Sequence, residues 1–513
     1  MRIERTKNAA RNILFGFLLR IVNIILPFVA RTVILYVLGA QYLGLTSLFT
    51  SILSFLSLAE LGVGTAMVYS MYKPIAENDT ETLCALMNTY KKFYRIIGTV
   101  ILALGLCVLP FLKNIIRGDV PADVNIYVLY LIYLINVVLS YWLFAYKNAV
   151  LIAHQRSDIN SKIALFIVPA SYIVMLGSLL LTKNYYLYII WMPVFTVITN
   201  ILQAIYVNKN FPELRAHGKI SDELRKSITK KVTALIGTKL NTVVLNAADN
   251  IVMSAFLGLT VIAIYGNYYY IMSSIIAFLG IAYSSITAGL GNSLQTDTLE
   301  KNYRDFEKFS FINSWLVGWC AVCLVCLYQP FMRIWVQDEE LMFPFFIVLE
   351  MAFYFYIYQI RKIPVTYKDA AGIWWEDRFR PYVCMVVNIV LNVWLVQVIG
   401  VSGIILSTVF SLFISIPWEN YTVFKYIFHC SSKKYYAKML IYFITMVLGG
   451  LLTYWLCSLF GDGIPQMLVR MVICLIVPNA VFMLFHFKRP EFKGTIDLVK
   501  HIFHRKKKTG ENS

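Results

Sequence analysis

Fourteen long apolar stretches alternate with short polar segments along the chain. A helix needs roughly 20 predominantly apolar residues to cross a bilayer, and each stretch is about that long or longer. The pattern therefore predicts an all-α polytopic membrane protein with about 14 transmembrane helices. The stretches cover residues 13–37, 43–70, 93–112, 125–150, 160–182, 186–207, 232–257, 261–290, 308–332, 342–364, 380–399, 402–424, 438–460 and 467–487.

The two halves of the chain share a weak internal repeat at an offset of 219 residues. Four polar or proline positions in the first apolar stretch have the same spacing as four positions in the seventh, and in each set they share one face of a helix. The first set is Arg20, Asn23, Pro27 and Arg31, and the second is Lys239, Thr242, Asn246 and Asn250. The pair Leu38-Gly39 also matches Leu257-Gly258 at this offset.

An even number of helices separates the repeats, so both copies have the same orientation in the membrane. This predicts two pseudo-symmetric six-helix lobes around a central cavity, followed by two further helices. The expected parts are an N-lobe (1–207, helices 1–6), a cytoplasmic connector (208–231), a C-lobe (232–425, helices 7–12), extra helices 13 and 14 (426–487) and a basic amphipathic cytoplasmic tail (488–513).

Composition and charge agree with a membrane protein. Hydrophobic residues make up 59% of the 513 residues and charged residues 14%, whereas soluble chains have about 45–50% and about 25%. Of the 46 Lys and Arg, 38 fall on the side of the N-terminus, five on the other side and three within helices. The positive-inside rule therefore makes both termini cytoplasmic. The net charge of +18 follows from this topology and from lipid contacts, so we expect no nucleic-acid partner.

No catalytic or metal motif occurs. The chain lacks a phosphate-binding Gly-x-x-x-x-Gly-Lys-Ser/Thr loop and a His-Glu-x-x-His pair. Cys320, Cys323 and Cys326 have the spacing of part of a cluster ligand set, but they lie in an apolar stretch where cysteine serves as a small apolar residue. We therefore expect no enzyme activity, no cofactor and no metal.

Ionisable residues at bilayer depth are the candidate functional groups, because each costs at least about 2.5–3.5 kcal/mol to insert. The candidates for contact with an anionic substrate are Arg20, Asn23, Arg31, Lys147, Lys239, Asn246 and Asn250. Lys147 is expected to share a helix face with Asn136 and Ser140. The alternative is that Arg20 and Arg31 snorkel to the two headgroup layers, and that Lys147 is an anchor at the cytoplasmic end.

Three acidic residues are candidates for ion coupling, since a buried carboxylate can carry a proton. They are Glu60, Asp249 and Glu350. Glu60 is expected to share a face with Thr50, Ser57 and Gly64, and Glu350 aligns with Tyr354 and Arg361. Each carboxylate could equally neutralise a neighbouring arginine.

The N-terminal region resembles the polysaccharide (Wzx-type) flippases of the multidrug/oligosaccharidyl-lipid/polysaccharide exporter superfamily. The residues that carry the resemblance are Arg31, Gly39, Gly44-Leu45, Glu60-Leu61-Gly62-Val63-Gly64, Lys73-Pro74-Ile75-Ala76 and Asp79, and, at the start of the second lobe, Ala248-Asp249-Asn250, Phe256-Leu257-Gly258 and Tyr265.

This resemblance implies transport of undecaprenyl-diphosphate-linked oligosaccharide across a bacterial plasma membrane for surface polysaccharide assembly, by alternating access coupled to an ion gradient. It also implies that Arg20 and Arg31 contact the diphosphate and that Glu60 is the acidic position of the second helix. The implied partners are membrane lipids, a polysaccharide polymerase and the chain-length machinery.

The alternatives are a cation-coupled multidrug exporter and a lipid II flippase of the same superfamily. The second is less consistent with the chain, because the eighth stretch lacks the arginine that lipid II flippases place there. A membrane glycosyltransferase or a non-transporting scaffold would fit the short external loops and the charges at bilayer depth less well.

Overall fold

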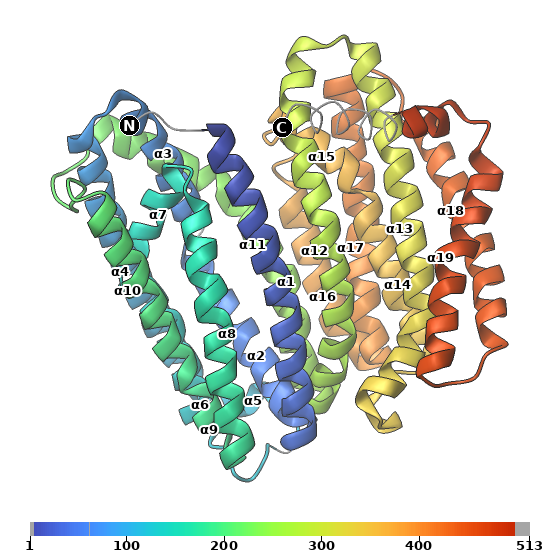
Figure 1. The fold of residues 1–513 in the computed structure, drawn as a ribbon, viewed down its shortest axis with the longest axis horizontal. Helices are drawn as coiled ribbons and strands as arrows, with labels where there is room; N and C mark the ends of the chain where they lie inside the picture. Colours follow the sequence, from blue (N-terminus) through green and yellow to red (C-terminus); the bar gives the residue numbers. More distant parts are fainter. Residues whose placement is uncertain (1–4, 61, 119, 498–513) are drawn as a thin grey trace, which may run out of the picture. The chain divides into compact units, whose positions relative to one another are not determined.

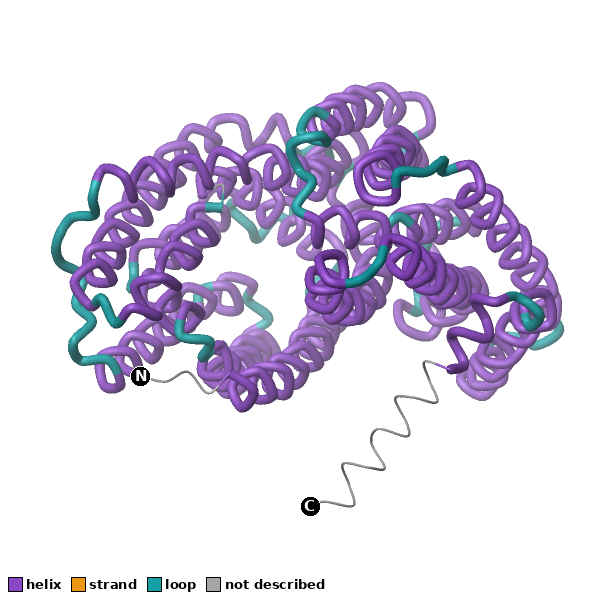
Figure 2. The backbone as a smooth tube through the Cα atoms, turned by 90° about the horizontal axis from the view of Figure 1, so that it is seen from above, coloured by secondary structure: helices purple, strands orange, loops and turns teal. Residues whose placement is uncertain are grey.

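The computed structural model describes residues 5–60, 62–118 and 120–497. The side chains of residues 5–10, 13, 231, 234–239, 241, 242, 245, 246, 285, 288, 289 and 292 are outside the description. Figure 2 shows the described chain as helices joined by loops, with no strand in these ranges. Contacts between Cα atoms divide the chain into two compact units, unit 1 (Met1–Gly266) and unit 2 (Asn267–Ser513).

Most helices lie where the apolar stretches predicted them (Figure 1), but the stretches 43–70 and 125–150 are each divided between two helices. Unit 1 contains α1 (Arg5–Val37), α2 (Ala40–Leu56), α3 (Val63–Glu77), α4 (Thr80–Val108), α5 (Leu112–Ile115), α6 (Ile126–Trp142), α7 (Ala145–Ala153), α8 (Ser157–Thr182), α9 (Tyr185–Ile189), α10 (Trp191–Asn210) and α11 (Asp222–Leu257). Next, α12 (Leu259–Thr296) runs through the boundary. Unit 2 continues with α13 (Leu299–Val336), α14 (Phe345–Ile360), α15 (Lys362–Ala371), α16 (Arg380–Ile399), α17 (Val401–Val423), α18 (Lys433–Ser458) and α19 (Ile464–His486).

The predicted fold class is confirmed: this is an all-helical polytopic membrane protein. Among the described residues, 12 helices are long and apolar enough to cross a membrane, and the pair α6 and α7, bent by 51°, makes a thirteenth span. The predicted crossing at 232–257 lies in α11. Among the described residues of α11, the apolar segment Ala247–Leu257 is shorter than a membrane span. The lobe boundaries at 207, 231 and 425 remain predictions.

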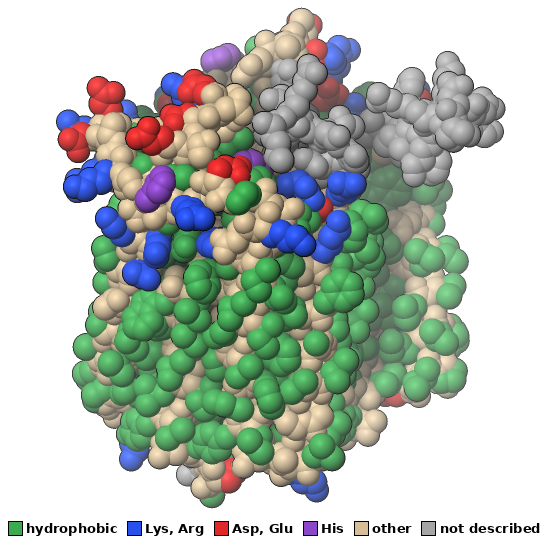
Figure 3. Space-filling model, turned by 60° about the vertical axis from the view of Figure 1, so that its left-hand side comes forward, with side chains coloured by type: hydrophobic (Ala, Val, Ile, Leu, Met, Phe, Trp, Pro, Cys, Tyr) green, Lys and Arg blue, Asp and Glu red, His purple; other side chains and the backbone are tan. Residues whose placement is uncertain are grey.

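Surface charges are distributed as a membrane protein requires. On the face drawn in Figure 3, hydrophobic side chains form a broad band. Lys and Arg gather beyond one edge of this band, and few appear beyond the other. The asymmetry has the pattern that the positive-inside rule uses.

The glycines of the two repeated Leu-Gly pairs adopt the same backbone conformation. Gly39, between α1 and α2, has φ 105° and ψ 173°, and Gly258, between α11 and α12, has φ 93° and ψ 176°. L-residues with a side chain rarely adopt this φ, so glycine is needed at both corners. The two corners therefore support the repeat at an offset of 219 residues.

Helix α2 packs against the second corner with almost no space between the backbones. A Cβ on Gly44 would lie 2.2 Å from the Leu259 carbonyl oxygen and 2.8 Å from its carbonyl carbon. Only glycine lets a helix approach another backbone this closely, so Gly44 fixes the distance between α2 and the start of α12.

Helix α1 is held against α8, its neighbour in Figure 1, by polar contacts at its first turns. The Asn12 side chain donates to the Gln155 carbonyl oxygen at 3.1 Å and accepts from the Asp158 N–H at 2.6 Å. The Lys162 ammonium lies 4.5 Å from the centre of the Phe15 ring. These contacts join the beginning of the chain to a helix made much later.

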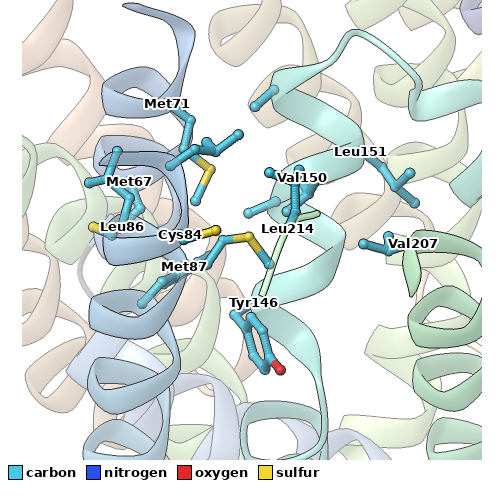
Figure 4. Packing of buried hydrophobic residues seen from close by; sticks show 14 of the residues in the cluster. Met67, Met71, Cys84, Leu86, Met87, Tyr146, Val150, Leu151, Val207 and Leu214 are labelled. Carbon is cyan, nitrogen blue, oxygen red and sulfur yellow. The ribbon is translucent and has the colours of Figure 1, made fainter. Parts of the chain in front are cut away.

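The predicted connector belongs to unit 1 and packs on its helices. Its Phe211 and Leu214 are buried in an apolar cluster formed by α3, α4, α7 and α10. Figure 4 shows Leu214 beside Val150 and Cys84 in this cluster. The Asn88 amide also donates to the Gly218 carbonyl oxygen at 2.8 Å. The connector is therefore attached to the helix ends by both apolar and polar contacts.

The extra helices α18 and α19 pack on α13. The Trp315 indole N–H donates to Asn479 Oδ1 at 2.7 Å, and the Trp319 indole N–H donates to the Cys474 carbonyl oxygen at 2.8 Å. Phe492, at the start of the predicted amphipathic tail, is buried and stacks on Trp315. The last part of that tail, residues 498–513, lies outside the described residues.

Candidate functional site

The polar residues of α1 lie at two depths of an apolar span. Arg20 and Asn23 are exposed, and Arg31 is half-buried, within the span Leu14–Val37. Eleven residues separate the two arginines, about 16 Å along a helix. Arg31 Nη2 lies only 2.9 Å from where a Cβ on Gly266 would be, so this glycine makes room for the guanidinium.

The candidates on α11 are only partly described. Asn250 donates from Nδ2 to Ser51 Oγ on α2 at 2.9 Å, and its buried Oδ1 accepts no hydrogen bond from the described residues. Asp249 is buried at 8% exposure. Lys239 and Asn246 belong to α11, but their side chains lie outside the description. Asn250 thus joins α11 to α2.

Lys147 does not share a continuous helix with Asn136 and Ser140, so that part of the prediction is wrong. The chain bends between α6 and α7, where Phe144 has a φ of 57°. Lys147 is buried and donates from Nζ to Asn208 Oδ1 at the end of α10. Asn136 instead accepts from Thr196 Oγ1 at 2.7 Å. The apolar run hides this bend because its hydropathy is continuous.

Glu60 lies at a break between two helices. We predicted one helix over 43–70, but α2 ends at Leu56, a short 3-10 turn covers Ser57–Glu60, and Gly62 adopts a φ of 84° before α3. Glu60 therefore does not share a regular helical face with Thr50 and Gly64. A glycine in the left-handed region ends a helix readily, which is the signal the Gly62-Val63-Gly64 sequence carried.

The break places Glu60 in a cavity of about 680 Å³ in unit 1. Glu60 Oε1 accepts from the Gly64 N–H at 2.8 Å and from the Tyr94 hydroxyl at 3.4 Å, and the Tyr90 hydroxyl donates to that of Tyr94 at 2.6 Å. A Cβ on Gly64 would lie 2.9 Å from all three oxygen atoms, so only glycine leaves space for this chain of hydrogen bonds.

A second cavity of about 400 Å³ lies next to the first, and Asn200 lines both. The walls combine aromatic rings with amides and hydroxyls, and the buried Asn200 Nδ2 has no hydrogen-bond partner among the described residues. Among the polar and aromatic residues that line one cavity or both are Tyr69, Tyr72, Tyr133, Asn136, Tyr141, Asn148, Tyr172, Tyr188, Thr196, Asn200 and Gln203.

Unit 2 contains a buried network of five charged side chains that the sequence did not reveal. Glu419 Oε1 on α17 accepts from Arg361 Nη1 at 2.8 Å and from Arg380 Nη1 at 3.0 Å. Arg380 also donates from Nε to Asp377 Oδ1 at 2.8 Å, and Asp377 pairs with Lys368. The network ties the break between α14 and α15 to the start of α16 and to α17.

Spacing along the chain could not have found this network, since Arg361, Asp377 and Glu419 come from different elements. Glu350 was expected to align with Arg361, but the Arg361 guanidinium pairs with Glu419. Glu350 Oε2 is buried and has no hydrogen-bond partner among the described residues. The network holds three cations and two carboxylates, so it keeps a net positive charge.

Comparison with known proteins bears on the fold. No protein-family model and no curated protein sequence matches the chain. A structure of the lipid II flippase MurJ in an inward closed conformation is similar over 93% of this chain and 98% of its own, with a TM-score of 0.61 and 16% identity.

Multidrug transporters are similar as well. An inward-facing multidrug resistance MATE family transporter of the MOP superfamily matches over 78% of this chain and 93% of its own, with a TM-score of 0.59 and 14% identity. A MATE transporter from Vibrio cholerae matches over 83% and 99%, with a TM-score of 0.57 and 11% identity. The chain therefore has the fold that these flippase and multidrug transporter structures share.

Proposed function

We propose that this protein is a flippase that carries undecaprenyl-diphosphate-linked oligosaccharide from the inner to the outer leaflet of a bacterial plasma membrane. The product would serve surface polysaccharide assembly, as O-antigen, capsule or exopolysaccharide. The fold likeness to a lipid II flippase supports movement of a lipid-linked substrate. Alternating access, coupled to an ion gradient, is the mechanism proposed with it.

The observation that carries this proposal is Arg20. Its side chain is exposed within the apolar span of α1, and no ion pair joins it to a described acidic residue. Such a charge costs at least about 2.5–3.5 kcal/mol in the membrane, which an anionic ligand would offset. Arginine binds phosphate through two parallel hydrogen bonds, so a diphosphate fits it well.

Arg31 gives the anion a second binding position about 16 Å along the same helix. A diphosphate that binds first at one arginine and then at the other would keep a cationic partner while it crosses much of the apolar layer. Lys239, Asn246 and Asn250 on the repeated helix are proposed to complete the path. The tyrosines and amides of the two cavities in unit 1 offer stacking surfaces and hydrogen bonds for sugar rings.

The topology belongs to the same proposal. Both termini would be cytoplasmic, because 38 of the 46 Lys and Arg fall on the N-terminal side. A polymerase and the chain-length machinery would receive the glycan on the opposite face.

Translocation of a fluorescent polyprenyl-diphosphate oligosaccharide in proteoliposomes tests the proposal. We expect Arg20→Gln combined with Arg31→Gln to slow transport by more than about tenfold, because each charge-assisted hydrogen bond to phosphate is worth about 1.5–3 kcal/mol. Arg20→Lys combined with Arg31→Lys keeps both charges and should retain part of the activity. Full activity of the Gln variant at matched reconstitution would remove the arginines from the mechanism.

A cation-coupled multidrug exporter is the second candidate, favoured by the carboxylate of Glu60 in a tyrosine-lined cavity. In either case Glu60 would carry the coupling cation, and Glu60→Gln should abolish acceleration by an ion gradient while leaving gradient-free exchange. The control is Glu77→Gln, since Glu77 forms only an exposed ion pair with Lys73 at 3.9 Å.

If wild type extrudes cationic dyes but moves no lipid-linked glycan, the exporter function replaces the flippase. Unchanged gradient dependence in Glu60→Gln would assign coupling elsewhere.

A further inference from the structure

Three cysteine sulfurs converge where α13, α18 and α19 meet. Cys326, Cys457 and Cys474 are exposed by only 3%, 2% and 1%. Their Sγ atoms all lie within 4.8 Å of one another, and all three cysteines are free thiols. Positions 326, 457 and 474 are far apart in the sequence, so no sequence motif predicts that these cysteines lie together.

The grouping does not follow from the cysteine spacing on α13. Cys320 and Cys323 precede Cys326 at three-residue intervals, yet neither belongs to the three-sulfur group. Each of the three helices contributes one thiol, and apolar side chains such as Val322 and Met446 surround them. Three soft donors thus point to one place in an apolar setting, from three separate backbones.

The separation of the sulfurs fits a metal ion. A metal–thiolate bond is about 2.3 Å long, so three sulfurs in a plane around one ion lie about 4 Å apart. The observed limit of 4.8 Å therefore requires only small side-chain movements. Among the described residues no fourth His, Cys, Asp or Glu joins the group. Structural zinc uses four ligands, whereas soft thiolate sets suit Cu(I).

An entrance and compensating charges lie beside the sulfurs. A cavity of about 620 Å³ is lined by Cys326 and Cys457 together with Arg333 and Arg470. Arg470 Nε is buried and has no hydrogen-bond partner among the described residues. Arg333 already pairs with Asp462 at 2.7 Å. Arg470 Nη2 also lies 3.8 Å from Asp462 Oδ1. The unsatisfied Arg470 Nε–H is therefore a remaining source of positive potential for a site that becomes negative when the thiols ionise.

We propose that Cys326, Cys457 and Cys474 form a three-coordinate site for a soft, thiophilic ion of the Cu(I) type. Binding replaces three S–H bonds with three Cu–S bonds and releases three protons to water, with no change in oxidation state. The site would clamp the two extra helices to α13, independently of the transport reaction.

A competition titration tests the site. Reduced, full-length protein in detergent is titrated anaerobically with Cu(I) against a chromogenic Cu(I) chelator. We expect one tightly held ion per chain. Replacing any one of the three cysteines with Ala should weaken binding by more than the roughly 10–100-fold that loss of an outer-shell partner costs. Cys320→Ala on the same helix and Cys384→Ala elsewhere in unit 2 are the matched controls and should bind as wild type does.

Alkylation gives a second measurement that does not depend on variants. Under conditions that open the bundle slightly, Cu(I) should protect Cys326, Cys457 and Cys474 from N-ethylmaleimide and leave the exposed Cys107 and Cys430 reactive. X-ray absorption should show three sulfur neighbours and no nitrogen or oxygen. Equal binding by wild type and the triple Ala variant, no protection by Cu(I), or a disulfide among the three cysteines in the isolated protein would each overturn the site.

Discussion

Replacing Glu419 with Gln is expected to destabilise the protein by about 3–5 kcal/mol, the cost of removing one partner from a buried ion pair. Glu419 is 1% exposed and accepts from both Arg361 and Arg380. Gln keeps the volume but removes the negative charge. Arg361 would then lose its one ion-pair partner among the described residues, and Arg380 would keep only Asp377.

Thermal unfolding of the purified protein, followed by tryptophan fluorescence, measures this loss. The matched control is Glu339→Gln, because Glu339 is 86% exposed and lies 3.8 Å from Arg333, so its loss should cost no more than about 1 kcal/mol. Combining Glu419→Leu with Arg361→Leu removes one charge of each sign and should recover part of the stability. A Glu419→Gln protein that unfolds like wild type would show that the network does not hold α14, α16 and α17 together.

Replacing Gly44 with Ala is expected to destabilise unit 1 by about 1–3 kcal/mol or more, the usual cost of overpacking. In an ordinary helix the same change gains about 0.8–1.0 kcal/mol. The sign reverses here because the new Cβ would lie 2.2 Å from the Leu259 carbonyl oxygen. A backbone atom cannot turn away as a side chain can, so α2 must move away from the corner at Gly258.

Gly177→Ala on α8 is the control, since no atom lies within 4 Å of the added Cβ. It should leave the unfolding temperature unchanged or raise it slightly. Gly44→Val should lower stability further than Gly44→Ala, as its two additional methyl groups meet the same backbone. If Gly44→Ala proved as stable as Gly177→Ala, close contact between α2 and the corner would not be a feature of the folded protein.

The apolar pattern sufficed to predict the fold, because membrane-spanning helices must satisfy their own backbone hydrogen bonds and must be apolar over a fixed length. The repeated Leu-Gly pairs likewise marked two corners of matching conformation. Hydropathy does not show, however, where a helix bends or breaks within an apolar run. The bend at Phe144 and the turn at Glu60 interrupt continuous apolar runs, and they changed the surroundings expected for Lys147 and Glu60.

Contacts between distant segments were beyond sequence reasoning for a related reason. Nothing in the sequence around Glu419 indicates that folding brings Arg361 and Arg380 to its carboxylate. In the sequence Cys457 and Cys474 are small apolar residues of separate helices, and only the fold places their sulfur atoms next to that of Cys326. A single sequence shows periodicity within one helix, but it does not show which faces of two helices meet.

The docking of α1 on α8 also sets an order for the synthesis of this protein. The chain emerges from the ribosome N-terminus first, so α1 enters the membrane with Arg20 before α8 exists. Asn12 and Phe15 find their partners Gln155, Asp158 and Lys162 only after the six helices α2–α7 have been made. Until α8 has been made, α1 lacks these contacts, so the first helix to be translated reaches its final place only after the eighth.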